Sequence, residues 1–129
     1  MGEAQIRGLR EGEDAPRDLL LLADPSPEAV DSYLARGRCF VAELGGEIVG
    51  EYVLIDTRPQ TGELVNIAVS EQEQGRGLGQ KLVQHAISWA HTNGYKTIGV
   101  GTGNSSIGQL VLYQKCGFRM VGVDRDFFT

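Results

Sequence analysis

The segment that decides the fold is Gln74-Gly75-Arg76-Gly77-Leu78-Gly79, in which three glycines alternate directly before a helical pattern. Apolar residues recur at helical spacing after it and Gly94 suits a C-terminal cap, so we predict a helix from Leu78 to Asn93. Glycines at the start of a helix leave backbone amides uncovered, and the helix dipole favours an anion there. The segment is therefore predicted to bind phosphate, with a pyrophosphate as the natural ligand.

The spacing of the glycines separates this loop from two common phosphate-binding motifs. A Walker loop ends in Gly-Lys followed by Ser or Thr, whereas Gly79 is followed by Gln80-Lys81-Leu82. A dinucleotide-binding loop reads Gly-x-Gly-x-x-Gly, and the last gap is shorter here. An ordinary turn without a ligand is the alternative, because glycines alternate in the same way over Gly99 to Gly103.

The chain before the loop is predicted to form a strand, two helices and an antiparallel meander. Ser26 suits an N-cap with proline at the first helical position, and from residue 39 on the apolar period becomes alternating, which is typical of strands. The predicted elements are a strand over Glu3 to Leu9, a helix over Pro16 to Ala23, a helix from Pro27 that ends at Gly37, and strands over Cys39 to Leu44, Glu47 to Asp56 and Glu63 to Val69, with turns at Gly45-Gly46 and Arg58 to Gly62.

The chain after the long helix is predicted to complete one mixed α/β domain over residues 1–129. Lys96 to Gly101 is predicted to be a strand, joined to the preceding strand by a right-handed parallel crossover. Ser105 or Ser106 suits the cap of a last helix that ends at Gly117, and Phe118 to Val123 is the final predicted strand. A length of 129 residues with 41% hydrophobic content fits a single core.

Three matches in order along the chain resemble the GNAT superfamily of N-acetyltransferases. The pattern Gln-x-x-Gly-x-Gly that begins at Gln74 resembles the family's coenzyme A loop, and the apolar strand Leu64 to Val69 precedes it at the family's distance. Leu112-Tyr113-Gln114-Lys115-Cys116-Gly117-Phe118 resembles a second family segment. The resemblance covers Glu63 to Phe118 and implies the GNAT fold, which is a central mixed, mostly antiparallel sheet with a parallel, splayed strand pair, flanked by helices.

The resemblance also implies an activity and a cofactor site. GNAT enzymes move an acetyl group from acetyl-coenzyme A (acetyl-CoA) to a primary amine of a small molecule or protein, and we expect no metal. The pantetheine arm is expected along Ile67, Ala68 and Val69, hydrogen-bonded like an added strand. The pyrophosphate is expected on the main-chain amides of the loop and the first helical turn, namely Gln74, Gly75, Arg76, Gly77, Leu78, Gly79 and Gln80.

Further cofactor contacts are implied at single residues. Arg76 is expected either to bind phosphate through a charge-assisted hydrogen bond or to be a solvated surface arginine. The Val69 amide is expected to polarise the acetyl carbonyl. Relatives usually have an asparagine seven residues before the tyrosine of the second segment, and that position is Ser106 here, with Asn104 two residues earlier. We expect one of these two to contact the pantetheine.

The implied chemistry requires a group that takes a proton from the acceptor. An alkyl ammonium has a pKa of about 10.4, so the reactive neutral amine is rare at pH 7, and a carboxylate can accept the proton as it leaves. Glu63 stands where histone-type GNAT enzymes place their catalytic glutamate; a solvent-facing acid at a strand end is the alternative. Other candidates for the base are a water chain or one of Glu43, Glu51 and Asp56.

Tyr113 matches the family tyrosine that stands near the thioester sulfur. It is expected to donate a proton to the departing thiolate, which helps the reaction without being obligatory, because a thiol with a pKa near 8.5 leaves tolerably as the anion. The alternative for Tyr113 is a core tyrosine on an amphipathic helix.

Composition narrows the partners and the compartment. The net charge of −5 argues against a nucleic-acid partner, which needs a basic patch, and is compatible with a cationic acceptor. The sequence has no leader-like start and no apolar run of bilayer length, so we expect a cytoplasmic protein without membrane attachment. Cys39 and Cys116 are too few for a disulfide framework and too isolated for a zinc site.

Four ring-bearing residues near the long helix are predicted to have no part in ligand binding. His85 and His91 lie six residues apart, so they cannot share a ligand, and both fall on the polar face, where we predict solvated histidines. Trp89 and Tyr95 are predicted to pack rather than to contact a cofactor.

Some alternatives stay open at this point. The family commonly has a strand after the one over Phe118 to Val123, whereas this chain stops at Thr129, so we expect the sheet to lack that strand or to take it from a partner chain, as in a homodimer. Two other functions compete with acetyl transfer: transfer of a longer acyl group, and a module that binds acyl-CoA as a sensor without turnover.

Overall fold

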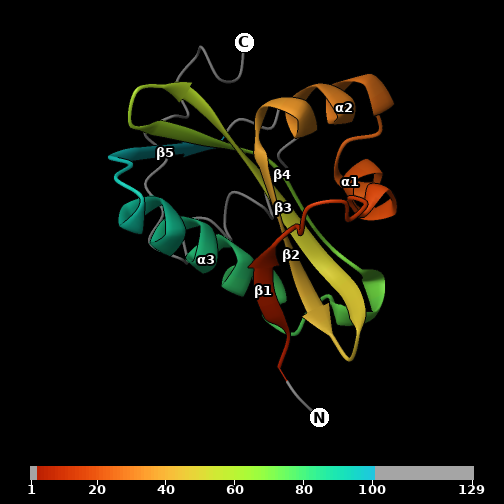
Figure 1. Cartoon of the computed structure of the whole chain (residues 1–129). Coiled ribbons are helices and arrows are strands. Elements are labelled where there is room, and N and C mark those ends of the chain that lie inside the picture. Colours follow the sequence, from red (N-terminus) through yellow and green to blue (C-terminus); the bar gives the residue numbers. More distant parts are fainter. Residues whose placement is uncertain (1–2, 101–129) are drawn as a thin grey trace.

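The computed structural model describes residues 3–100 of the chain (Figure 1). A strand and two short helices precede three consecutive strands, and the longest helix follows the glycine loop. The elements are β1 (Gln5–Gly8), α1 (Arg17–Ala23), α2 (Pro27–Arg36), β2 (Arg38–Leu44), β3 (Glu47–Arg58), β4 (Thr61–Val69), a 3-10 turn (Glu71–Glu73), α3 (Leu78–Thr92) and β5 (Thr97–Val100).

Within the described residues the strands form one sheet in the order β1-β2-β3-β4-β5. Neighbouring strands are antiparallel from β1 to β4, whereas β4 and β5 are parallel and are connected through α3. Gly45 and Gly46 form the β2–β3 turn with φ angles of 59° and 85°, which glycine adopts without strain. The predicted fold class, a mostly antiparallel mixed sheet with a parallel strand pair flanked by helices, is confirmed.

Helices cover both faces of this sheet, α3 on one and the pair α1 and α2 on the other (Figure 1). On the α3 face, Leu82 of the helix and Tyr52 of β3 belong to one buried cluster. On the α1/α2 face, Leu20 of α1 and Val53 of β3 belong to a second cluster. Tyr52 and Val53 are consecutive, so the alternation of side chains along β3 divides them between the two cores.

The turn predicted over Arg58 to Gly62 contains only Pro59-Gln60, because β3 and β4 both extend into the predicted range. Gly62 is a strand residue and lies against the Tyr95 ring, where an added Cβ would come within 3.0 Å of a ring carbon. The glycine therefore marks a close approach of a side chain to the strand and not a turn.

The predicted starts of α2 at Pro27 and of α3 at Leu78 agree with the structure, whereas α1 begins at Arg17, one residue after the predicted Pro16, which is its N-cap. Ser26 caps α2, and its Oγ accepts a hydrogen bond from the Ala29 amide at 3.2 Å. The helix and strand predicted after residue 104 lie outside the described residues. Among residues 3–100, no helix is long and apolar enough to cross a membrane.

Candidate functional site

The loop between β4 and α3 begins the helix without a side-chain cap. Gly75 and Gly77 both have a φ of 83°, a left-handed conformation that glycine adopts readily. A Cβ built on either glycine meets no atom within 4 Å, so the outer side of the loop is open in the described part of the chain. The amides of Leu78 and Gly79 have no acceptor within the helix, as in any first helical turn. This geometry suits an anion.

Gln74 ties the loop back to the end of β4. Its side-chain Nε2 donates a hydrogen bond to the Val69 carbonyl oxygen at 3.0 Å. The Arg76 side chain is 71% exposed, and its Nη1 lies 3.8 Å from a carboxylate oxygen of Glu73. Gln74 therefore shapes the loop, while Arg76 stays at the surface beside it, where an exposed pair of this length contributes little.

The outer edge of β4 has no partner strand over its second half in the described part of the chain. β5 pairs with Thr61 to Leu64. The Ser70 amide donates to the Val49 carbonyl at 2.8 Å, and the alternation of an antiparallel pair then turns the amides of Ile67 and Val69 away from β3. These main-chain groups form an edge to which an extended ligand can add like a further strand.

A β-bulge at Val65 separates the two halves of β4. Asn66 is opposite Val53 in β3, but Leu64 is opposite Leu54, so Val65 is an extra residue. A bulge bends its strand and increases the local twist. Because Leu64 is also the last β4 residue that pairs with β5, the bend begins where the parallel strands part. No signal in the sequence marks this bulge, since it is a mismatch in register with β3 that β4 alone does not contain.

Asn66 fastens β4 to both helices of the α1/α2 face. It is fully buried, and its Nδ2 donates to the Leu20 carbonyl at 3.0 Å and to the Tyr33 hydroxyl oxygen at 2.6 Å. Burial raises the pKa of Tyr33 to about 12. No role was predicted for Asn66 from the sequence, although a single polar residue inside an apolar strand was the available signal.

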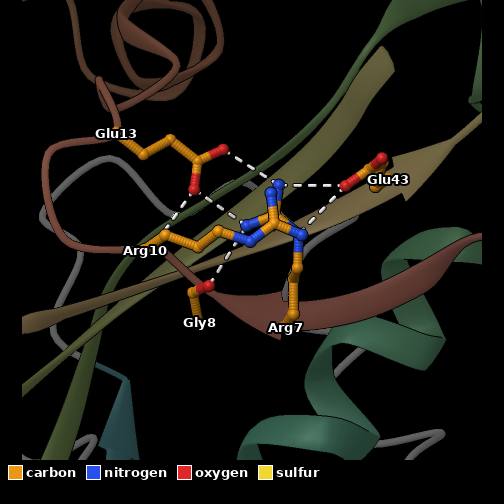
Figure 2. Close-up of polar contacts among 5 residues, drawn as sticks. All are labelled: Arg7, Gly8, Arg10, Glu13 and Glu43. Atoms are coloured by element: carbon orange, nitrogen blue, oxygen red, sulfur yellow. Dashed lines mark hydrogen bonds and ion pairs between the residues drawn. The ribbon is translucent and has the colours of Figure 1, made fainter. Parts of the chain in front are cut away.

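Glu43, one of the alternative bases, is engaged by Arg7 (Figure 2). Arg7 Nε donates to Glu43 at 3.0 Å, and its two Nη atoms donate to the two oxygens of Glu13 at 2.8 and 2.9 Å. Hydrogen bonds from Arg7, and then from the Arg10 backbone, lower the pKa of Glu13 to about 2. This cluster joins β1, β2 and the loop before α1, so Glu43 has a structural partner.

Asp56, another alternative base, lies at the far end of α3. It accepts a hydrogen bond from the Tyr95 hydroxyl, and both residues line a pocket of about 560 Å³ together with Arg38 and Trp89. α3 has 15 residues and is therefore about 22 Å long, so this pocket is distant from the glycine loop. Trp89 and Tyr95 pack on each other with ring centroids 5.6 Å apart, which confirms their predicted packing.

The remaining two acids lie on the α1/α2 face of the sheet. Glu63 is half-buried, with Ile55 opposite it in β3 and Gly99 in β5. Glu51 is fully buried, and neither carboxylate oxygen has a hydrogen-bond partner among the described residues. Burial raises the pKa of Glu51 well above its ordinary value. A carboxyl group shifted in this way is a candidate for a functional site.

His85 corrects one prediction. It was expected to be solvated, but its Nδ1 lies 2.7 Å from the Tyr52 hydroxyl, and its ring centroid is 5.3 Å from that of Phe40. Burial lowers the pKa of His85. The apolar face of α3 is wider than the helical pattern indicated, because aromatic residues of β2 and β3 extend the core to its flank. His91 is exposed, as predicted.

Several predicted site residues lie outside the described residues, namely Tyr113, Asn104 and Ser106. The structure brings the others together around the second half of β4 and the start of α3: Ile67, Ala68, Val69 and the loop from Gln74 to Gln80. Glu63 lies nearer the start of the same strand. Among residues 3–100, no three His, Cys, Asp or Glu side chains gather as metal ligands would.

Known proteins resemble this chain in sequence. Residues 10–118 match the sequence profile of the Acetyltransferase (GNAT) family. The uncharacterized N-acetyltransferase YvbK of Bacillus subtilis (strain 168) is 58% identical over 128 residues, which are 99% of this chain and 83% of that protein. The chain spans less than half the length of the rat N-acetyltransferase 8 proteins it matches.

Solved structures show the same fold. A Bacillus subtilis acetyltransferase in complex with CoA is 56% identical, with a TM-score of 0.82 over 91% of this chain and 77% of that chain. An acetyltransferase from Elizabethkingia anophelis with acetyl-CoA bound is 46% identical, with a TM-score of 0.86 over 92% of this chain and 78% of that chain.

Proposed function

The chain belongs to the GNAT family of acetyltransferases, and on this premise we propose that it transfers the acetyl group of acetyl-CoA to a primary amine of a small molecule or protein. The observation that carries the proposal is the open start of α3 beside the free edge of β4. The start of α3 suits a diphosphate, and the edge of β4 suits an extended amide chain. Acetyl-CoA contains both groups.

The cofactor site follows from these two features. We propose that the amides from Gln74 to Gln80 hold the pyrophosphate and that Arg76 of the same loop adds a charge-assisted bond. The pantetheine arm would run along Ile67, Ala68 and Val69, where the outward amides are offered. Asn104 or Ser106 would complete its contacts. The positive φ angles of the loop support this assignment, because they expose its peptide groups.

The chain's own residues divide the chemistry of transfer. The bound co-substrate supplies an acyl group on a thiol leaving group. The Val69 amide donates to the acetyl oxygen and stabilises the charge that develops there. Glu63 takes the proton from the amine, and Glu51 is a fully buried acid on the same face of the sheet. Tyr113 donates a proton to the departing sulfur.

A binding and turnover experiment tests the proposal. Acetyl-CoA should raise the melting temperature of the chain, since a ligand at 100 times its dissociation constant adds about 2.7 kcal/mol to the free energy of unfolding. Thiol release should then depend on an added amine from a panel of alkylamines, amino sugars and peptides. No shift with acetyl-CoA or a longer acyl-CoA would overturn the cofactor assignment. A shift without release from any amine would favour the sensor module.

A matched pair of glycine variants localises the cofactor. Gly77→Glu should abolish the acetyl-CoA shift, because its carboxylate would lie where the diphosphate binds. Gly12→Glu is the control, since Gly12 has the same φ of 83° and equally open surroundings in the loop before α1. Equal loss of the shift in both variants would mean that the loss comes from backbone strain, and would remove this support for the loop.

A further inference from the structure

The buried side-chain oxygen atoms without a hydrogen-bond partner in the described part of the chain come from three residues. They are both carboxylate oxygens of Glu51, the Oδ1 of Asn66 and the Oγ of Ser70. Proteins pair nearly all such atoms, and each exception calls for an explanation. The exceptions here are neighbours, so one explanation can serve all of them.

The sheet register places these three residues around Ala68. Glu51 is directly opposite Ala68, and Asn66 precedes Ala68 by two residues on β4. Ser70, the residue after the end of β4, follows Ala68 by two and continues the pairing through its amide bond to the Val49 carbonyl. Side chains two apart on a strand share a face, and diagonal neighbours on paired strands lie about 7–8 Å apart. The contacts of Asn66 with Leu20 show that this is the α1/α2 face.

The unpartnered atoms share one chemistry. All of them can accept hydrogen bonds, the Ser70 hydroxyl can also donate one, and one residue is an acid, whereas the Asn66 and Tyr33 donors are already used. The Asn66 Nδ2 donates to Leu20 and Tyr33, and the Tyr33 hydroxyl donates to Asp24 at 3.3 Å. The group that matches several acceptors and one carboxyl is an ammonium, which carries a positive charge and three donors and accepts nothing.

We propose that Glu51, Asn66 and Ser70 form the subsite that binds the acceptor as a cationic alkylammonium. This rests on the proposed function and adds the residues that bind the charged form of its acceptor. The subsite lies beside Ile67 and Val69, the residues whose outward amides are assigned to the acyl donor, so the amine and the acyl group approach β4 from its face and its edge respectively.

The surroundings of Glu51 support this assignment. The ionisable groups facing it are Tyr33 of α2 and Cys39 of β2, and burial raises the pKa of each to about 12, so both are uncharged at neutral pH. The carboxyl group therefore has no positive partner among the described residues. The oxygens of Glu51 are closed to solvent in the free chain. We therefore expect α1 and α2, which cover this face of the sheet, to shift as the amine enters.

Kinetics of Glu51→Gln test the proposal, using an amine that the wild-type chain acetylates. Removing the charge should raise the KM for that amine at least tenfold, which corresponds to 1.4 kcal/mol, with the KM for acetyl-CoA changed less than twofold. Glu47→Gln is the control, because Glu47 is an exposed acid on the same strand. Ser70→Ala should raise the amine KM in the same direction by less.

A binding measurement gives a second readout. In the presence of CoA, butylammonium chloride should raise the melting temperature of the wild-type chain more than 1-butanol does, and Glu51→Gln should abolish this difference. If Glu51→Gln acetylates the amine with unchanged KM, or if butanol stabilises as well as butylammonium, the subsite is wrong while the acetyltransferase proposal stands. If the wild-type chain releases no thiol with any amine, the proposed function itself fails.

Discussion

Each face of the sheet contains a fully buried polar side chain, but the two side chains differ in whether they have a hydrogen-bond partner. On the α3 face, Tyr52 is fully buried, and its hydroxyl has a partner in His85 at 2.7 Å. On the α1/α2 face, Glu51 is equally buried, and its oxygens have no partner among the described residues. An unpaired buried polar group lowers the stability of the fold. The α3 face therefore has the properties of a core, whereas Glu51 on the α1/α2 face does not contribute to stability.

The largest effect should come from truncation on the α3 face. Leu82 is fully buried and lies against β3, where a Cβ on Gly50 would be 3.1 Å from its Cδ1. Leu82→Ala should lower the free energy of unfolding by about 2–5 kcal/mol, through lost burial and the cavity left behind. Urea denaturation measures this. Leu22→Ala is the control, because Leu22 is 55% exposed, and a comparable loss there would contradict the assignment of the core.

The opposite sign is expected on the other face. Glu51→Met replaces a buried carboxyl that has no partner with an apolar side chain of similar size, and should raise the free energy of unfolding by about 1–3 kcal/mol at pH 8. Acceptor turnover should be lost at the same time. A destabilised Glu51→Met chain would mean that the carboxyl is part of the core, and the contrast between the faces would disappear.

The gain in Glu51→Met should depend on pH. The folded chain raises the pKa of Glu51 above its unfolded value, so the folded state holds this proton more tightly than the unfolded state. Stability of the wild-type chain therefore falls as the pH rises above about 4.5 towards the folded pKa. The difference between Glu51→Met and wild type should be larger at pH 8 than at pH 5, as measured by urea denaturation at both values.

His85 should give the reverse pH dependence on the α3 face. Burial lowers its pKa, so the unfolded chain binds the proton more tightly. The stability due to the neutral ring is present above about pH 6.5 and is lost as the pH falls towards the folded pKa. His85→Gln should flatten the stability profile between pH 7.5 and 5.5, whereas the exposed His91→Gln should leave it unchanged. A flattened profile in both variants would assign the effect elsewhere.

Much of the fold could be predicted because its signals are local. The Gly-Gly hairpin turn, the Ser26 cap and the period of α3 each depend on residues close in sequence. The loop residues assigned to the cofactor were found in the same way, since backbone geometry at a helix start follows from glycines in order along the chain.

The features that were missed depend on distant partners. The Val65 bulge is a mismatch in register between two strands, and neither strand contains it alone. The sequence could not indicate that Glu51, among the alternative bases, is the acid without a hydrogen-bond partner in the described residues. Glu43 is paired with Arg7 and Asp56 with Tyr95, and both partners lie far away in sequence. His85 was misjudged for the same reason, as its partner Tyr52 belongs to another strand.

The smallest effect should come from the Arg7 cluster, which is polar like the Glu51 subsite but is paired and half-buried. Hydrogen bonds from Arg7 and the Arg10 backbone lower the pKa of Glu13 to about 2. The stability that depends on its charge is therefore present above about pH 4.5 and is lost as the pH falls towards 2. NMR titration of the Glu13 carboxyl should give the low pKa in the wild-type chain and a clearly higher pKa in Arg7→Ala, in which only the Arg10 amide still donates to Glu13.

The same titration, together with amine turnover, shows whether the Arg7 cluster is structural or takes part in the reaction. If Arg7→Ala leaves the Glu13 pKa low, the Arg10 amide holds the charge alone, and the cluster is local to the loop before α1. If the pKa rises and amine turnover is unchanged, the cluster anchors β1 to that loop without serving the reaction. Glu51 differs from Glu13 in that its carboxyl group has no positive partner among the described residues, and in the proposed subsite the bound ammonium supplies that partner.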